Sequence, residues 1–172
     1  TIAIASYLSK KVKTAVGAQL ATWILAVLMF FDDYANVLIA GSTMRPLSDR
    51  MKVSKEKFSF VLDASSAPVV GIALISTWVG YEVGLIKNVF ESIGIQENYY
   101  SVFLRMIPYS FYNLFTLFLC LMVIFQSRDF GPMYEAEIRA RTTGKLLSDT
   151  AKPMASGELE NMEIRKDIEL KV

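Results

Sequence analysis

Histidine is absent from this sequence of 172 residues, and cysteine occurs only once. Without histidine, the chain lacks the side chain that most often carries protons near neutral pH and most often binds metals. Proton chemistry near pH 7 would therefore have to use carboxylates in perturbed surroundings or, less plausibly, lysines. The single cysteine, Cys120, excludes a disulfide within the chain.

A strong excess of charge of either sign is also missing, because 18 basic residues face 17 acidic ones for a net charge of +1. No patch of basic residues interleaved with aromatic ones is present, which is the pattern typical of nucleic-acid binding. We therefore expect no nucleic-acid partner. No motif indicates a cofactor, and we expect none.

An initiator methionine and a secretory signal sequence are both missing, since the chain begins at Thr1 without a basic, an apolar and a cleavage region in order. We interpret the chain as the C-terminal part of a longer protein. Its first 13 residues form a basic lead-in that contains Lys10, Lys11 and Lys13. The missing N-terminal spans of the same protein would then be partners of this part.

Apolar residues are abundant, because they make up 53% of the chain and gather in three blocks. The blocks cover about residues 14–43, 58–80 and 101–126. A straight helix needs ~20 apolar residues to cross a lipid bilayer. We therefore predict an all-α membrane protein in which residues 14–127 hold three hydrophobic spans. Residues 128–172 are predicted to be a polar tail, with an amphipathic helix over residues 134–147 followed by a flexible end.

The first block is interrupted by two adjacent carboxylates, Asp32 and Asp33. A charged residue at the centre of a membrane helix costs about 2.5–3.5 kcal/mol, so such a pair is a functional hypothesis by default. One arrangement is a discontinuous helix that crosses once and unwinds at the carboxylates. The other is a re-entrant hairpin that turns there and returns over about 10 residues, or ~15 Å. Pro46 is expected to disfavour helix at Arg45.

Basic residues are distributed unequally between the segments that join the blocks. Residues 44–57 contain five, residues 128–145 contain four, and residues 82–101 contain one. Cytoplasmic segments carry an excess of lysine and arginine. We therefore expect the loop 44–57 and the C-terminal tail to face the cytoplasm, in a protein that passes through the plasma membrane several times. The lysines before residue 14 fit this topology only with the hairpin.

The two adjacent carboxylates point about 100° apart on a regular helix, so both can line one cavity only if the backbone unwinds. Asn36 shares a helix face with either aspartate and adds a neutral oxygen ligand that suits a small alkali cation. Two carboxylates close together in a low dielectric do not both ionise easily, so a proton and a cation can compete for them. The alternative is that one or both aspartates cap a helix end at the interface.

The second block carries Asp63, which is followed by Ser65 and Ser66. Asp63 could join the same cation site together with Ser66, or it could pair with Arg105 or lie near lipid headgroups. Arg45 is either a topology charge or the partner of a carboxylate. The candidate cation- and proton-binding residues are Asp32, Asp33, Asn36, Asp63 and Ser66, with Arg45 and Arg105 as candidate charge partners.

Longer motifs run through the chain from about Lys11 to Lys145. They are Phe30-Phe31-Asp32-Asp33-Tyr34-Ala35-Asn36, Gly41-Ser42-Thr43-Met44-Arg45-Pro46 with Asp49, Ser54-Lys55-Glu56-Lys57, Asp63-Ala64-Ser65-Ser66-Ala67-Pro68-Val69, Ile75-Ser76-Thr77-Trp78-Val79-Gly80, Arg128-Asp129-Phe130-Gly131-Pro132-Met133 and Arg139-Ala140-Arg141-Thr142-Thr143-Gly144-Lys145. In these motifs the chain resembles the NhaC-type sodium/proton antiporter family. The resemblance implies a polytopic secondary transporter, not an enzyme, that exchanges sodium ions for protons. The family also includes carriers of organic anions or amino acids, so the substrate stays open.

The remaining alternatives are a membrane enzyme, a non-transporting membrane scaffold and, as the weakest of them, a soluble helical bundle. Magnesium-dependent enzymes that act on diphosphates usually need a second Asp-rich cluster, which this sequence lacks. An intramembrane aspartyl protease needs an opposing aspartate in a suitable motif, and Asp63 has none. A scaffold predicts that neutralising Asp32 and Asp33 leaves the function intact.

Overall fold

The computed structural model describes residues 12–149 and 151, and all regular elements in this part of the chain are helical. In chain order they are α2 (Ala15–Leu28), α3 (Asp33–Arg50), α4 (Lys55–Ile72), α5 (Thr77–Ser92), α6 (Tyr99–Met106), the short 3₁₀ helix η1 (Ile107–Tyr109), α7 (Phe111–Gln126) and α8 (Pro132–Thr143). The predicted all-α class is thereby confirmed. Of the N-terminal lysines, Lys10 and Lys11 lie outside the described residues.

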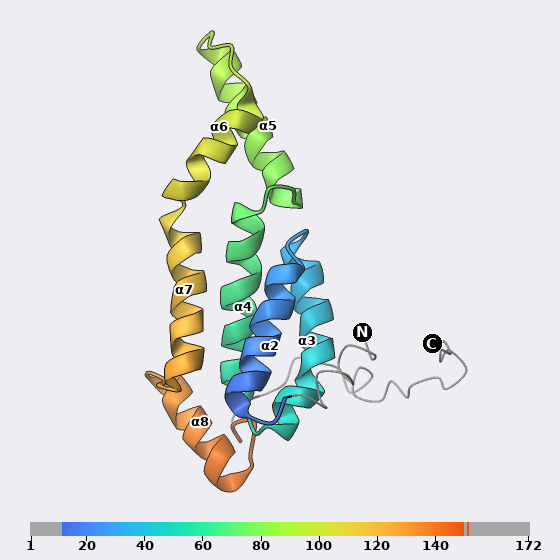
Figure 1. The fold of residues 1–172 in the computed structure, drawn as a ribbon, viewed down its shortest axis with the longest axis vertical. Helices are drawn as coiled ribbons and strands as arrows, with labels where there is room; N and C mark the ends of the chain where they lie inside the picture. Colours follow the sequence, from blue (N-terminus) through green and yellow to red (C-terminus); the bar gives the residue numbers. More distant parts are fainter. Residues whose placement is uncertain (1–11, 150, 152–172) are drawn as a thin grey trace, which may run out of the picture.

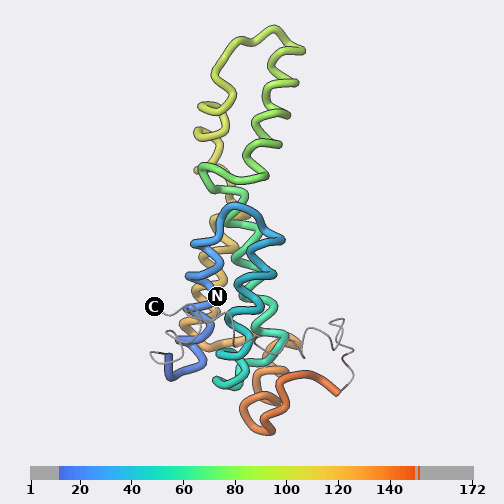
Figure 2. The backbone as a smooth tube through the Cα atoms, turned by 90° about the vertical axis from the view of Figure 1, so that its right-hand side faces the viewer, coloured from blue at the N-terminus to red at the C-terminus, as the bar shows by residue number. Residues whose placement is uncertain are grey.

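The first apolar block folds as a helical hairpin. Helix α2 begins after Thr14, whose hydroxyl accepts a hydrogen bond from the Gly17 backbone N–H at 3.0 Å. The chain turns over residues 29–32, and α3 then runs back antiparallel to α2 (Figures 1 and 2). The hairpin is therefore the observed arrangement, and its tip lies at the two adjacent aspartates.

Helix α3 is longer than the sequence indicated. It has 18 residues, or about 27 Å, and it continues through Pro46 to Arg50. The expectation that the helix would end near Arg45 and the expectation of a return leg of about 10 residues were both wrong. Met44 and Leu47, on either side of Pro46, are buried in one apolar cluster. We attribute the continuous helix to this packing, which outweighs the local preference of proline.

The other two apolar blocks form bent pairs of helices. Ser54 caps α4, because its hydroxyl accepts a hydrogen bond from the Lys57 N–H at 3.2 Å. After α4, the chain breaks over residues 73–76 and α5 continues at 45°, while α6 with η1 meets α7 at the same angle. The segment 82–101, which was expected to join two apolar blocks, is therefore mostly helical, and α5 extends into it as far as Ser92. The amphipathic helix expected over 134–147 is observed as α8.

Within the described residues, no single helix has both the length and the apolar composition needed to cross a membrane. The two bent pairs, Lys55–Ile72 with Thr77–Ser92 and Tyr99–Tyr109 with Phe111–Gln126, satisfy these criteria when each pair is taken together. Helix α2 is apolar but has only 14 residues.

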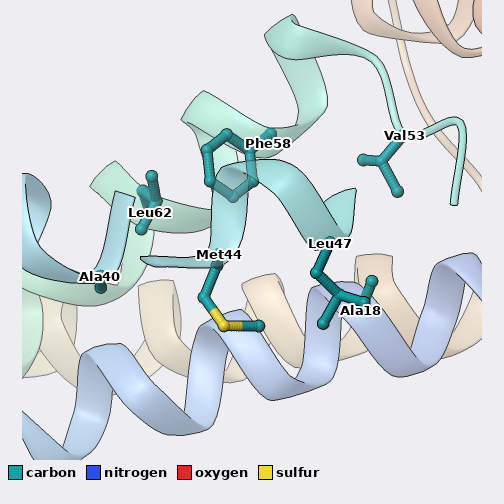
Figure 3. Packing of buried hydrophobic residues seen from close by; sticks show 7 residues of the cluster. All are labelled: Ala18, Ala40, Met44, Leu47, Val53, Phe58 and Leu62. Carbon is teal, nitrogen blue, oxygen red and sulfur yellow. The ribbon is translucent and has the colours of Figure 1, made fainter. Parts of the chain in front are cut away.

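The core lies in the part of the bundle where α2, α3, α4 and α7 run side by side (Figures 1 and 2). One buried cluster joins the first three of these helices (Figure 3) and contains Ala18, Ala40, Met44, Leu47, Val53, Phe58 and Leu62. A second cluster joins α4 to α7 through Val61, Cys120 and Ile124. The hairpin of α5 and α6 projects beyond this core, and each of these two helices buries a single residue. The start of α2, the loop 51–54 and α8 lie at the opposite end (Figure 1).

Candidate functional site

Asp32 holds the tip of the first hairpin in place. As the N-cap of α3, its Oδ1 accepts a hydrogen bond from the Ala35 N–H at 2.9 Å. Its Oδ2 accepts a hydrogen bond from the Thr77 hydroxyl at 3.2 Å, and the Thr77 N–H donates to the Phe31 carbonyl at 3.0 Å. The carboxylate therefore lies at the N-termini of both α3 and α5, where helix dipoles present their positive ends.

The break between α4 and α5 meets this tip, so two interruptions of helical structure lie together. Ser76 caps α5 by accepting from the Val79 N–H at 3.2 Å, and its hydroxyl donates to the Val70 carbonyl at 3.0 Å. The Tyr100 hydroxyl donates to the Leu74 carbonyl at 2.8 Å. These bonds satisfy part of the backbone that the break releases, while the Thr77 bonds to Asp32 and Phe31 link α5 to the hairpin.

Asp33 and Asn36 differ from Asp32, because each leaves a buried oxygen without a partner. Asn36 is fully buried, and its Nδ2 donates to the Ala26 carbonyl at the end of α2 over 2.7 Å. In the described part of the chain, Asn36 Oδ1 and Asp33 Oδ1 have no hydrogen-bond partner. Residues three apart share a helix face. The first turn of α3 therefore presents two unpaired hard oxygens, one of them from a carboxylate, which is chemistry suited to an alkali cation or a proton.

Asp63 and Ser66 lie on α4 and are not joined to this pair. Asp63 is exposed and lines an open groove between α3 and α4 together with Val37, which lies one turn after Asp33. Ser66 is buried, and its hydroxyl donates to the Asp63 carbonyl at 3.4 Å. Among the described residues, no three acidic or cysteine side chains converge as a metal-binding group.

The two arginines proposed as charge partners lie on α3 and α6. Arg45 follows Asp33 by 12 residues on α3, which is about 18 Å along the helix axis. Arg105 is exposed in the last turn of α6. No ion pair joins it to Asp63 in the part of the chain that the structure describes.

A buried ionic junction at the opposite end of the bundle was not anticipated from the sequence. Lys57, in the first turn of α4, forms an ion pair with Asp129 in the segment between α7 and α8, and the two side chains are only 1% and 3% exposed. Their positions are 72 residues apart. Both lie in motifs that carry the family resemblance, but nothing in the sequence pairs them.

Helix α8 adds two further links to the same end of α4. Buried Glu137 accepts a hydrogen bond from the Ser54 N–H at 2.8 Å and is also paired with Arg141 at 3.1 Å. The Arg139 guanidinium donates to both carboxylate oxygens of Glu56, at 2.7 and 2.9 Å. The buried charged groups of this junction are therefore paired.

Comparison with known proteins shows to which family the chain belongs. An uncharacterized protein of Haemophilus influenzae is 29% identical over 163 residues, which are 93% of this chain and 31% of that relative. The chain thus spans about a third of the length of the relative that it matches. No solved structure matches. Residues 69–166, more than half of the chain, match the Na+/H+ antiporter family, and the chain therefore belongs to this family.

Proposed function

We propose that this chain is part of a membrane antiporter that exchanges sodium ions for protons, with the cation bound at Asp33 and Asn36. The observation that carries the proposal is the pair of buried, unpaired oxygens on one face of α3, in a chain that belongs to the antiporter family. A sodium ion prefers oxygen ligands, and a carboxylate can exchange such an ion for a proton. Because the described chain has no histidine, Asp33 is the proposed proton carrier.

The two adjacent aspartates have different roles in this proposal. Asp32 is the positioning residue, since both of its oxygens already accept hydrogen bonds from Ala35 and Thr77. Asp33 is the exchanging residue, since one of its oxygens has no partner among the described residues. Asp63 and Ser66 stay proposed ligands from α4. The role proposed for Asp63 is supported by the groove that it lines. Val37 lines the same groove and lies one turn after Asp33 on α3.

We base the proposed membrane topology on the distribution of basic residues. The two bent helix pairs would cross the plasma membrane, and residues 14–127 would form the membrane part. The start of α2, the loop 51–54 and α8 share one end of the bundle, which would face the cytoplasm because of its basic residues (Figure 1). With the hairpin, Lys13, just before α2, no longer conflicts with this orientation. Exchange there would serve sodium and pH homeostasis.

The proposal is tested by replacing Asp32 and Asp33, one at a time, with asparagine in the protein as the host cell produces it. Exchange is then measured in everted membrane vesicles. Asp33→Asn should abolish proton movement driven by added sodium, because the exchanging carboxylate is lost. Asp32→Asn should keep much of the exchange, because asparagine caps a helix about as well as aspartate. Unchanged exchange in Asp33→Asn would contradict the proposal. Loss of sodium response with retained transport of an organic anion or amino acid would favour a carrier of that class.

A further inference from the structure

We propose that the seam between α2 and α3 is the route along which water and the cation reach Asp33 from the end of the bundle that holds the loop 51–54. The proposal rests on the ion-binding role proposed for Asp33 and extends it to residues that no comparison assigns. It names Asn36 and Thr43 as the side chains that line the route.

Unpaired buried polar atoms are concentrated on one helix. Among the described residues, five buried side-chain nitrogen or oxygen atoms have no hydrogen-bond partner, and α3 carries four of them: Asp33 Oδ1, Asn36 Oδ1, Thr43 Oγ1 and Ser48 Oγ. A buried polar atom without a partner costs about 1–3 kcal/mol, so such atoms are few in folded proteins and call for an explanation. Water or an ion along this helix would supply the missing partners.

Thr43, like Ser48, differs from several other hydroxyl-bearing residues inside the helices. Thr22 in α2 donates to the Ala18 carbonyl at 2.8 Å, and Ser42, the neighbour of Thr43, donates to the Ile39 carbonyl at 3.2 Å. Ser65 in α4 makes the same kind of bond to the Val61 carbonyl. This local bond is the usual way to satisfy a hydroxyl in a helix. Thr43 is only 5% exposed and makes no such bond, and its hydroxyl has no partner in the part of the chain that the structure describes.

The unpaired oxygens at Asp33, Asn36 and Thr43 follow a single stripe of α3. Their positions are separated by three and then seven residues, which is the spacing of one helix face, and they extend over about 15 Å. Fully buried Ala40 is the small residue between them. Ser48 lies further along α3, towards the loop 51–54, and is fully buried.

Helix α2 supplies the opposite wall of the seam. The bond from Asn36 to the Ala26 carbonyl fixes the register of the two antiparallel helices. Seven residues further along α3, Thr43 therefore lies level with about residue 19 of α2. That residue is Gln19, which is buried at 4% exposure, and the next polar residue along this face is fully buried Thr22. Both helices thus contribute polar side chains to the seam, next to the apolar cluster of Figure 3, to which both helices also contribute.

Cysteine labelling tests the seam without relying on ion exchange, so its result is independent of the assay for Asp33. Thr43→Cys is made in a Cys120→Ala background, and membranes are treated with a small cationic thiosulfonate. The unaltered protein is the control, since native Cys120 is fully buried in the apolar contact of α4 with α7. We expect the cysteine at position 43 to react faster than Cys120. A rate equal to or below that of Cys120 would overturn the proposal.

A second variant separates a role in conduction from a role in folding. Thr43→Val removes the hydroxyl and keeps the volume, so the thermal midpoint should stay the same or rise, because an unpaired polar group is removed. Sodium-driven exchange should nevertheless fall, by up to about tenfold, which corresponds to loss of one hydrogen-bonding ligand. Ser42→Ala is the matched control and should leave the exchange unchanged. Full exchange in Thr43→Val would also overturn the proposal.

Discussion

Two buried polar regions of this molecule differ in whether their polar groups are paired. Among the described residues, the side-chain oxygens of Asp33, Asn36 and Thr43 on the buried face of α3 have no hydrogen-bond partner. The junction of α4 with α8, at the far end of the bundle, pairs its buried charges, Lys57 with Asp129 and Glu137 with Arg141. Unpaired oxygens reduce stability but can bind a ligand, whereas paired charges hold segments together and have little capacity left for binding. The difference separates the candidate ion-binding region from a structural one.

The largest effect is expected from breaking the Lys57–Asp129 ion pair. Lys57→Ala would leave the Asp129 carboxylate buried without its partner, which should lower the free energy of unfolding by about 3–5 kcal/mol. Chemical denaturation in detergent micelles measures the change. The double variant Lys57→Met with Asp129→Leu should recover most of the loss, because it removes both charges together. If the single and the double variants were equally unstable, the ion pair would not be the cause.

A smaller effect is expected at Asn36, which has one paired and one unpaired polar atom and so combines the behaviour of both regions. Asn36→Ala removes the bond to the Ala26 carbonyl and should lower the free energy of unfolding by about 1 kcal/mol. It also removes a proposed cation ligand, so the sodium concentration for half-maximal exchange should rise. Exposed Asn88 on α5 provides the control, and Asn88→Ala should change neither quantity. An altered stability with an unchanged sodium dependence would restrict Asn36 to a structural role.

The smallest effect is expected at the half-exposed pair of Arg139 and Glu56. Arg139→Gln should lower the free energy of unfolding by about 0.2–1 kcal/mol, and the difference should shrink at high salt because the pair is partly solvated. The more exposed pair of Lys87 and Glu91, at 3.8 Å, is the reference. Lys87→Gln should have no measurable effect. If Arg139→Gln lowered the free energy of unfolding as much as Lys57→Ala does, the solvent exposure of an ion pair would not determine its contribution to stability.

Much of the local structure follows from residues that are neighbours in sequence. The apolar blocks predicted helices, and the structure has helices in all three of them. Asp32 could be interpreted either as an ion ligand or as a helix cap, and its contacts show that it caps α3. The expectation that Pro46 would end the helix was wrong, because the local preference of proline against helix is weaker than the packing of Met44 and Leu47 on either side of it. The pairing of Lys57 with Asp129 could not be predicted, because 72 residues separate them and many other charges were available.

The sequence by itself determined the helical class and, through the absence of histidine, the expectation that proton chemistry near pH 7 would use carboxylates or lysines. Only the tertiary structure decided that the first block folds back on itself and that the two adjacent aspartates have different surroundings. Thr77, 45 residues away, bonds Asp32, while the Asp33 Oδ1 atom is buried without a partner in the described chain. The physical reason is that the partners of a buried polar atom are set by which helices meet. That meeting depends on packing over the whole bundle, not on the residues beside the atom.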